Sequence, residues 1–92
     1  MTTAPVTVVT GASGGICSAL ARILAAAGHR LVLTGHEPVP LDELAAEIMS
    51  GGGQVEALAG DVRDRRLSGQ IVALACERFG RIDNLVLSLI HI

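Results

Sequence analysis

Short apolar runs alternate along this chain with longer segments in which apolar residues recur every three or four positions. The β-branched run at residues 6–9 predicts a buried strand. Residues 16–27 then show helical spacing, and Gly28 follows as a helix stop. This spacing predicts that six side chains of the helix face a sheet: Ile16, Ala19, Leu20, Ile23, Leu24 and Ala27.

The same alternation continues to the end of the chain. Strands are predicted at residues 31–33, 55–59 and 85–87, and helices follow the first two of them. The second helix is expected to bury Leu41, Leu44, Ala45 and Ile48, and the third Ile71, Leu74, Ala75 and Phe79. The pattern predicts an α/β fold, a Rossmann-type doubly wound parallel sheet, of which residues 1–92 form a single partial domain with the N-terminal βαβαβαβ portion.

Composition and charge exclude several functions. The formal net charge is −2 and all seven basic residues are arginines spread along the chain, so no nucleic-acid partner is expected. No apolar run approaches the roughly 18 residues of a membrane span, and the first residues lack a signal peptide's features, which predicts a cytoplasmic protein without membrane contact. The two cysteines, Cys17 and Cys76, and the three histidines, His29, His36 and His91, lack metal-ligand spacing, so no metal site is expected. We expect the three histidines to lie in solvated loops.

A glycine-rich turn joins the first predicted strand to the first predicted helix. It contains Thr10, Gly11, Ser13 and Gly15, and such a turn presents backbone N–H groups to a phosphate. Gly11 would allow a sharp turn and Gly15 the close approach of a pyrophosphate, while Ser13 could donate a hydroxyl and Thr10 could tie the turn to its neighbours. The alternative is that the glycines serve only the close packing of helix and strand, as in many α/β domains that bind no phosphate at this turn. No lysine follows it, which argues against an ATPase-type phosphate loop.

With this turn the sequence resembles the short-chain dehydrogenase/reductase family, whose loop reads TGxxxGxG. Thr10, Gly11 and Gly15 match that loop, and residues 79–86, FGRIDNLV, match the approach to the family's fourth strand. Asp61 and Val62 stand where the family places an aspartate that meets the adenine ring and its apolar neighbour. The resemblance covers residues 6 to 86 and implies that Ile16 also lies in the cofactor site.

The resemblance implies an NAD(P)-dependent oxidoreductase that transfers hydride to or from a carbonyl or alcohol. At the end of the second strand the family reads the cofactor's ribose, and here no acid occupies Thr34, Gly35 or His36. His36 could meet the 2′-phosphate, so NADP is favoured over NAD. The alternative is that Thr34, Gly35 and His36 form an ordinary turn in which the histidine contacts no cofactor. The resemblance further implies a small-molecule substrate and, for the full-length form, a homo-oligomer.

Three departures from the family pattern shape the functional prediction. Cys17 replaces the last loop glycine, and overpacking at such a position costs on the order of 1–3 kcal/mol. The NNAG that ends the family's fourth strand is absent, and the chain contains neither Tyr nor Lys, so the catalytic Ser and Tyr-x-x-x-Lys set is missing. We therefore interpret the chain as an inactive N-terminal fragment of such an enzyme. The alternatives are a non-catalytic nucleotide-binding module and a non-functional truncated product.

The last six residues, 87–92, depart from the family altogether. Their sequence, LSLIHI, is also what a transposon-end sequencing adapter encodes in one reading frame. We expect these residues to be non-native. A genuine apolar strand is the alternative interpretation.

Overall fold

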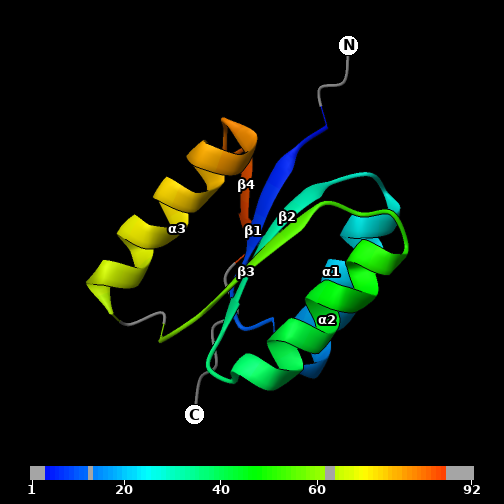
Figure 1. Cartoon of the computed structure of the whole chain (residues 1–92), viewed down its shortest axis with the longest axis horizontal. Coiled ribbons are helices and arrows are strands. Elements are labelled where there is room, and N and C mark those ends of the chain that lie inside the picture. Colours follow the sequence, from blue (N-terminus) through cyan, green and yellow to red (C-terminus); the bar gives the residue numbers. More distant parts are fainter. Residues whose placement is uncertain (1–3, 13, 62–63, 87–92) are drawn as a thin grey trace.

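A computed structural model describes residues 4–12, 14–61 and 64–86, which form a parallel sheet with helices on both faces (Figure 1). The elements follow in the order β1 (Val6–Val9), α1 (Gly15–Ala26), β2 (Arg30–Gly35), α2 (Pro38–Ser50), β3 (Val55–Ala59), α3 (Arg65–Phe79) and β4 (Asn84–Val86). The α/β class and the predicted alternation of elements are confirmed. The expectation for residues 87–92 lies outside the described residues.

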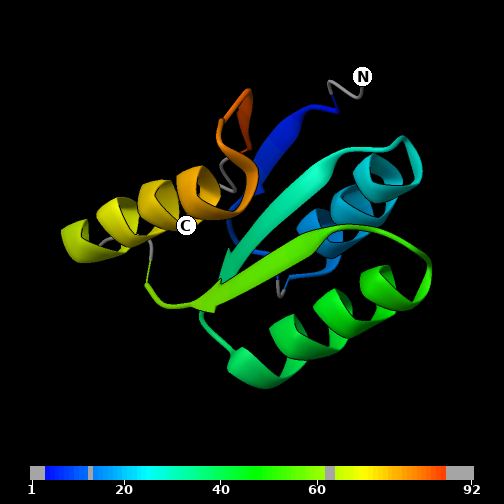
Figure 2. The same ribbon diagram turned by 45° about the horizontal axis from the view of Figure 1, so that its top comes forward.

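The strands are arranged in the order β3-β2-β1-β4, and each neighbouring pair is parallel. Helices α1 and α2 cover one face and α3 covers the other, while β4 lies at an edge beyond β1 (Figure 2). The connection from β1 leads through α1 to β2 on one side, and β4 pairs with the other side of β1. The strand order therefore reverses at β1, which is where ligands bind in sheets of this type.

Helices α2 and α3 bury the faces that their sequences predict. The buried residues of α2 are Leu41, Leu44, Ala45 and Ile48, as expected. In α3, Ile71 and Ala75 are buried, and Leu74 and Phe79 pack against the same core cluster. This helix begins two residues earlier than expected because Asp64 caps it, accepting a 2.9 Å hydrogen bond from the Arg66 amide.

The prediction for the face of α1 is wrong for four of its six residues. Ile16 is 87% exposed and Ile23 is 65% exposed, and Ala19 and Ala27 are exposed as well. The helix buries Cys17 and Ala21 instead. Leu24 packs against the same core cluster, as predicted, and Ala25 does so as well. Apolar residues occur nearly all round this helix, so their spacing fits two faces. Contact through the smaller side chains lets the helix approach the sheet more closely, which fits the tight packing of protein interiors.

The prediction that all histidines lie in solvated loops is also wrong for one of them. The His29 Nδ1 lies 2.9 Å from the hydroxyl of Thr7, a residue buried in β1, and His29 itself is half-buried. His36 is exposed, as expected, and His91 lies outside the described residues. None of the three described helices has the length and apolar composition that a bilayer crossing requires.

Candidate functional site

The carboxyl ends of β1, β2 and β3 lie side by side at one end of the sheet. The Ala12 amide in the loop after β1 donates a 2.9 Å hydrogen bond to the carbonyl of Thr34, near the end of β2. The Gly60 amide, directly after β3, donates a 2.9 Å hydrogen bond to the carbonyl of Gly35. These two bonds hold the glycine-rich loop, the end of β2 and the start of the β3–α3 connection side by side.

The loop turns sharply from β1 into α1. Gly11 has a φ of 66°, which an L side chain rarely adopts, and its carbonyl accepts a 3.0 Å hydrogen bond from the Gly14 amide. Gly14 is the N-cap of α1, and its carbonyl accepts the first helical bond, 2.9 Å from the Ser18 amide. Helix geometry leaves the N–H groups of the first turn, from Gly15 onward, for an acceptor outside the helix.

The surface beside Gly15, at the first turn of α1, is open. A Cβ atom built on Gly15 would meet no heavy atom within 4 Å, whereas one on Gly14 would lie 3.4 Å from the Gly11 carbonyl oxygen. The adjacent Ile16 is almost fully exposed. A helix N-terminus with amides facing open space is a general binding arrangement for phosphate. The residues present therefore fit the pyrophosphate of a dinucleotide.

Thr10 ties the loop to β4. Its amide and its hydroxyl both donate to the carbonyl of Val86, at 2.9 Å and 3.1 Å. Thr10 is buried, so its hydrogen bonds fix the start of the loop from inside the protein. Asp61 stands one residue after Gly60 and is half-buried, and its carbonyl accepts a 2.9 Å hydrogen bond from the Asp64 amide.

The following predicted site residues thus lie around the carboxyl ends of the strands: Thr10, Gly11, Gly15, Ile16, His36 and Asp61. His36 is exposed immediately after β2. Ser13 and Val62, which were also predicted to contact the cofactor, lie outside the described residues.

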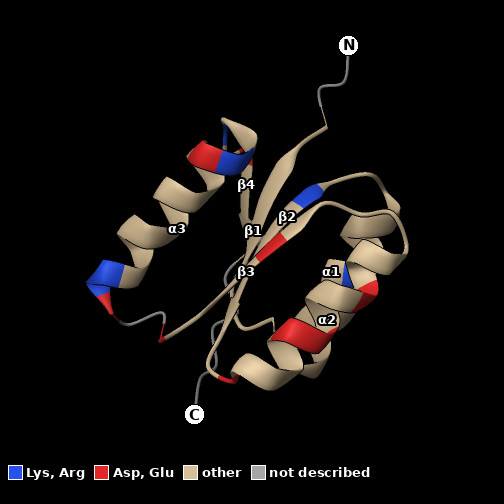
Figure 3. Cartoon of the chain, viewed as in Figure 1, with Lys and Arg blue, Asp and Glu red and all other residues tan. Residues whose placement is uncertain are grey.

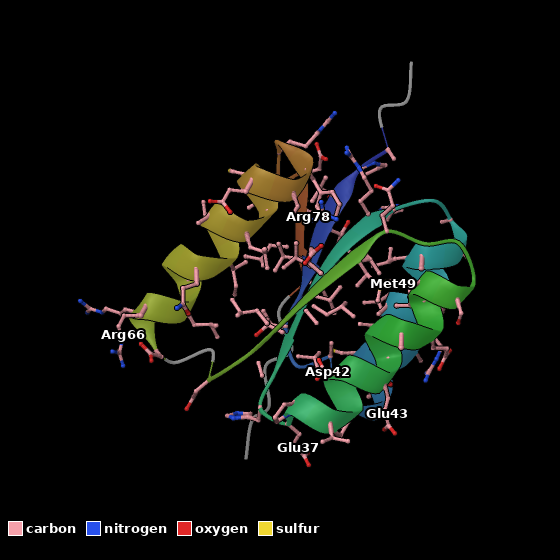
Figure 4. The ribbon with its side chains drawn as sticks, viewed as in Figure 1. Glu37, Asp42, Glu43, Met49, Arg66 and Arg78 are labelled. Atoms are coloured by element: carbon pink, nitrogen blue, oxygen red, sulfur yellow. The ribbon has the colours of Figure 1, made fainter. Side chains whose placement is uncertain are left out.

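Charge near the site is mixed. All three described helices begin at this end of the sheet, so the positive ends of their dipoles lie there. Glu37 is the N-cap of α2, and Asp42 and Glu43 lie in its second turn (Figure 4). Figure 3 shows further charge at the beginning of α3, where Arg66 pairs with Asp64 at 3.3 Å. Among the described residues, no three of His, Cys, Asp and Glu come together as a metal site would require.

Sequence reasoning gave no role to Asp83, which the structure shows to fasten β4 to β1. The Val6 amide donates to its carboxylate at 2.7 Å, and Arg81 donates to the same carboxylate at 2.6 Å. These partners lower the pKa of Asp83, with Arg81 the larger cause. An acid directly before a short apolar strand was the available signal.

Two further cavities lie beside the sheet. One, of about 410 Å³, lies at the opposite end of the sheet between the last turns of α1 and α2 and is lined by Gly28, Arg30 and Gly52 among others. The other, of about 190 Å³, lies between β1, β4 and α3. Thr10 lines the smaller cavity, whereas Gly11, Gly14 and Gly15 line neither of the two.

Comparison with known proteins identifies relatives over most of the chain. A family model described as short chain dehydrogenase matches residues 5–88. The 3-oxoacyl-[acyl-carrier-protein] reductase of Synechocystis sp. is 38% identical over 85 residues, which are 91% of this chain and 34% of that protein. The chain therefore spans about a third of the length of this relative.

Solved structures show the same similarity. The L-sorbose reductase of Gluconobacter frateurii, crystallised with NADPH and L-sorbose, superposes with a TM-score of 0.89 and 30% identity over 96% of this chain and 34% of that chain. An alcohol dehydrogenase of the archaeon Thermococcus sibiricus, in complex with 5-hydroxy-NADP, has a TM-score of 0.81 and 35% identity over 88% of this chain and 35% of its own.

Proposed function

The chain belongs to the short chain dehydrogenase family, and from this premise we propose that it forms the dinucleotide-binding portion of an NAD(P)-dependent oxidoreductase. The observation that carries the proposal is the open glycine-rich loop at the start of α1, with Gly11 at positive φ and free space in front of Gly15. We treat residues 1–92 as one partial domain of a cytoplasmic enzyme, whose longer form is a homo-oligomer.

The proposed reaction is hydride transfer between the cofactor and a small carbonyl or alcohol substrate. When bound, a nicotinamide cofactor supplies or accepts the hydride. The residues of this chain would bind and orient it: the first-turn amides of α1 hold the pyrophosphate, Ile16 covers it, and Asp61 meets the adenine. Proton transfer to the substrate needs a further acid, because the chain contains no Tyr and no Lys.

NADP is the favoured cofactor. The end of β2 carries Thr34, Gly35 and His36, so no carboxylate stands at these positions to oppose a 2′-phosphate. The solved relatives named above were crystallised with NADPH or an NADP analogue. The imidazole of His36 is exposed at the end of β2, where it could approach the phosphate.

The test is a titration with NADPH, followed by the cofactor's own fluorescence because the chain has no Trp or Tyr. We expect saturable binding, and we expect Gly15→Val to weaken it at least tenfold, because the valine side chain enters the space reserved for the pyrophosphate. Gly69→Val in α3 is the matched control, since Gly69 also has no heavy atom within 4 Å of its built Cβ.

Both variants should remain folded, which circular dichroism can check. Absence of saturable NADPH binding by the folded parent chain would overturn the proposal. Equal binding by the Gly15→Val variant would show that the loop is a packing turn only.

A further inference from the structure

The short connection between β2 and α2 begins directly beside the glycine-rich loop. The Thr34 carbonyl accepts a hydrogen bond from the Ala12 amide of that loop, and the Gly35 carbonyl accepts one from the Gly60 amide, both at 2.9 Å. His36 follows Gly35 directly and is exposed. An exposed imidazole therefore stands where β2 leaves the sheet, between the loop and the β3–α3 connection.

The beginning of α2 offers a phosphate few backbone donors. A helix start normally presents about four unpaired N–H groups. Here Pro38 and Pro40 lack an N–H group, so Val39 alone of the first three helical residues retains one. The Leu41 amide donates a 3.3 Å hydrogen bond to the Glu37 carbonyl. Recognition of a phosphate at this point therefore depends on side chains.

The side chains that adjoin this connection are mainly acidic. Glu37 is exposed at the N-cap of α2, and Asp42 and Glu43 are exposed in its second turn (Figure 4). Asp61 is half-buried in the neighbouring connection after β3. Carboxylates repel a phosphate group through their charge. Without a positive charge beside them, these residues would oppose a cofactor that carries a 2′-phosphate.

The described arginines lie away from the beginning of α2. Three of them are at the opposite end of the sheet: Arg30, Arg78 and Arg81. Arg22 pairs with Glu47 in the second half of α2 at 2.6 Å. Arg65 and Arg66 begin α3, which covers the other face of the sheet (Figure 2). Within the described part of the chain, His36 is therefore the basic group that adjoins the beginning of α2.

We propose that the protonation of His36 sets the preference between NADPH and NADH. The imidazolium attracts the 2′-phosphate of NADPH, whereas the neutral imidazole leaves the surrounding carboxylates to repel it. An imidazole exchanges its proton around neutral pH, and carboxyl groups titrate well below that range. NADH has no 2′-phosphate, so its binding does not follow this protonation. The inference deepens the proposed function and rests on the dinucleotide binding proposed there.

The test is the ratio of the NADH dissociation constant to the NADPH dissociation constant. Fluorescence titrations of the 92-residue chain measure both constants at pH 6.5, 7.5 and 8.5, at constant ionic strength and without phosphate buffer. We expect the ratio to rise about threefold from pH 8.5 to pH 6.5. One exposed charge pair changes an equilibrium constant by up to about fivefold, and an imidazole is only partly protonated at the lower pH.

Two variants of His36 separate its protonation from that of the 2′-phosphate, which takes up a proton near pH 6. His36→Arg keeps its positive charge at every pH, so its ratio should stay high and should not fall as the pH rises. His36→Gln carries no charge, so its ratio should stay low and nearly constant. His29→Gln is the matched control, because His29 precedes β2 at the other end of the sheet. Its ratio should follow that of the parent chain.

Circular dichroism checks that each variant folds. Saturable binding of both cofactors by the parent chain, with a ratio independent of pH, would overturn the inference and leave the proposed function standing. Equal pH dependence in the parent chain and in His36→Gln would also overturn it, because another group would then carry the proton. Absence of saturable binding of either cofactor by the folded parent chain would overturn the proposed function, and this inference with it.

Discussion

Side-chain hydrogen bonds help to hold β1 and β4 together at both ends of the pair. Asp83 accepts a hydrogen bond from the Val6 amide at the beginning of β1, and Thr10 donates to the Val86 carbonyl at its end. The glycine-rich loop starts directly after Thr10. The position of the loop therefore depends on how β4 is fastened.

The hydrogen bonds to Asp83 should make the stability of the chain depend on pH. Because its pKa is lowered in the folded state, the contribution of the carboxylate is fully present above the ordinary carboxyl range, near 4, and is lost as the pH falls through the lowered value. We expect Asp83→Asn to lower the melting temperature at pH 7 and to have a progressively smaller effect below pH 4. Thermal melts by circular dichroism across this range measure it.

Asp42→Asn on α2 is the control for this prediction, because that exposed carboxylate has no hydrogen-bond partner among the described residues. Its melting temperature should follow the parent chain at every pH. A constant difference between parent and Asp83→Asn down to pH 2 would contradict the proposed role of the carboxylate.

His36 provides a test of cofactor choice at the end of β2. We expect His36→Asp to weaken NADPH binding more than NADH binding, since a carboxylate repels the 2′-phosphate and accepts hydrogen bonds from ribose hydroxyls. His36→Arg should shift the ratio of the two dissociation constants the opposite way. Fluorescence titrations with both cofactors give this ratio, and a ratio unchanged in both variants would remove His36 from the site.

The loop residues were predictable because their chemistry is local. A glycine at positive φ and a glycine before open space each follow from neighbouring residues, as Gly11 and Gly15 show. The hydrogen bond from the Thr10 hydroxyl to Val86, by contrast, joins residues 76 positions apart. The contact of Asp83 with Val6 joins residues 77 positions apart, and no local pattern specifies it.

Helices show how far periodicity alone predicts packing. In α2 the apolar residues form a single stripe opposite charged positions such as Glu43 and Glu47, so the buried face was clear. In α1 apolar residues surround most of the helix. The choice between the Ile16–Ile23 face and the Cys17–Ala21 face depends on how closely α1 can approach the sheet, which the sequence of α1 alone does not contain.

The close approach of α1 gives a prediction at the level of this element. Ala21→Leu should destabilise the fold by about 1–3 kcal/mol, because Ala21 is fully buried and the added atoms have no room. Ala19→Leu on the exposed side should stay within about 0.5 kcal/mol of the parent. Urea unfolding measures both free energies, and equal effects would show that the face is wrongly assigned.

The molecule as a whole joins a glycine-rich loop to a sheet in which, among the described residues, β4 forms an outer edge. Binding and catalysis are separable in such a protein. We expect the purified chain to bind NADPH without oxidising it in the presence of ketones or aldehydes, because a positioned acid contributes typically 10²–10⁴-fold and the chain has neither Tyr nor Lys.

The measurement is the loss of NADPH absorbance over hours, with the L-sorbose reductase and L-sorbose as the positive control. Cofactor oxidation that follows the chain through successive purification steps, and disappears in the Gly15→Val variant, would contradict the prediction.

The pairing of β1 with β4 has a consequence for how the chain reaches its folded state. β1 lies in the middle of the sheet, yet one of its two neighbours is made of residues 84–86. During synthesis, the chain can pair β1 with β2 and close α1 over them long before β4 has left the ribosome. One side of this strand then remains unpaired until residues 84–86 have been made, and contacts between such distant residues form slowly. A chaperone that binds extended apolar segments would find residues 6–9 accessible during this interval.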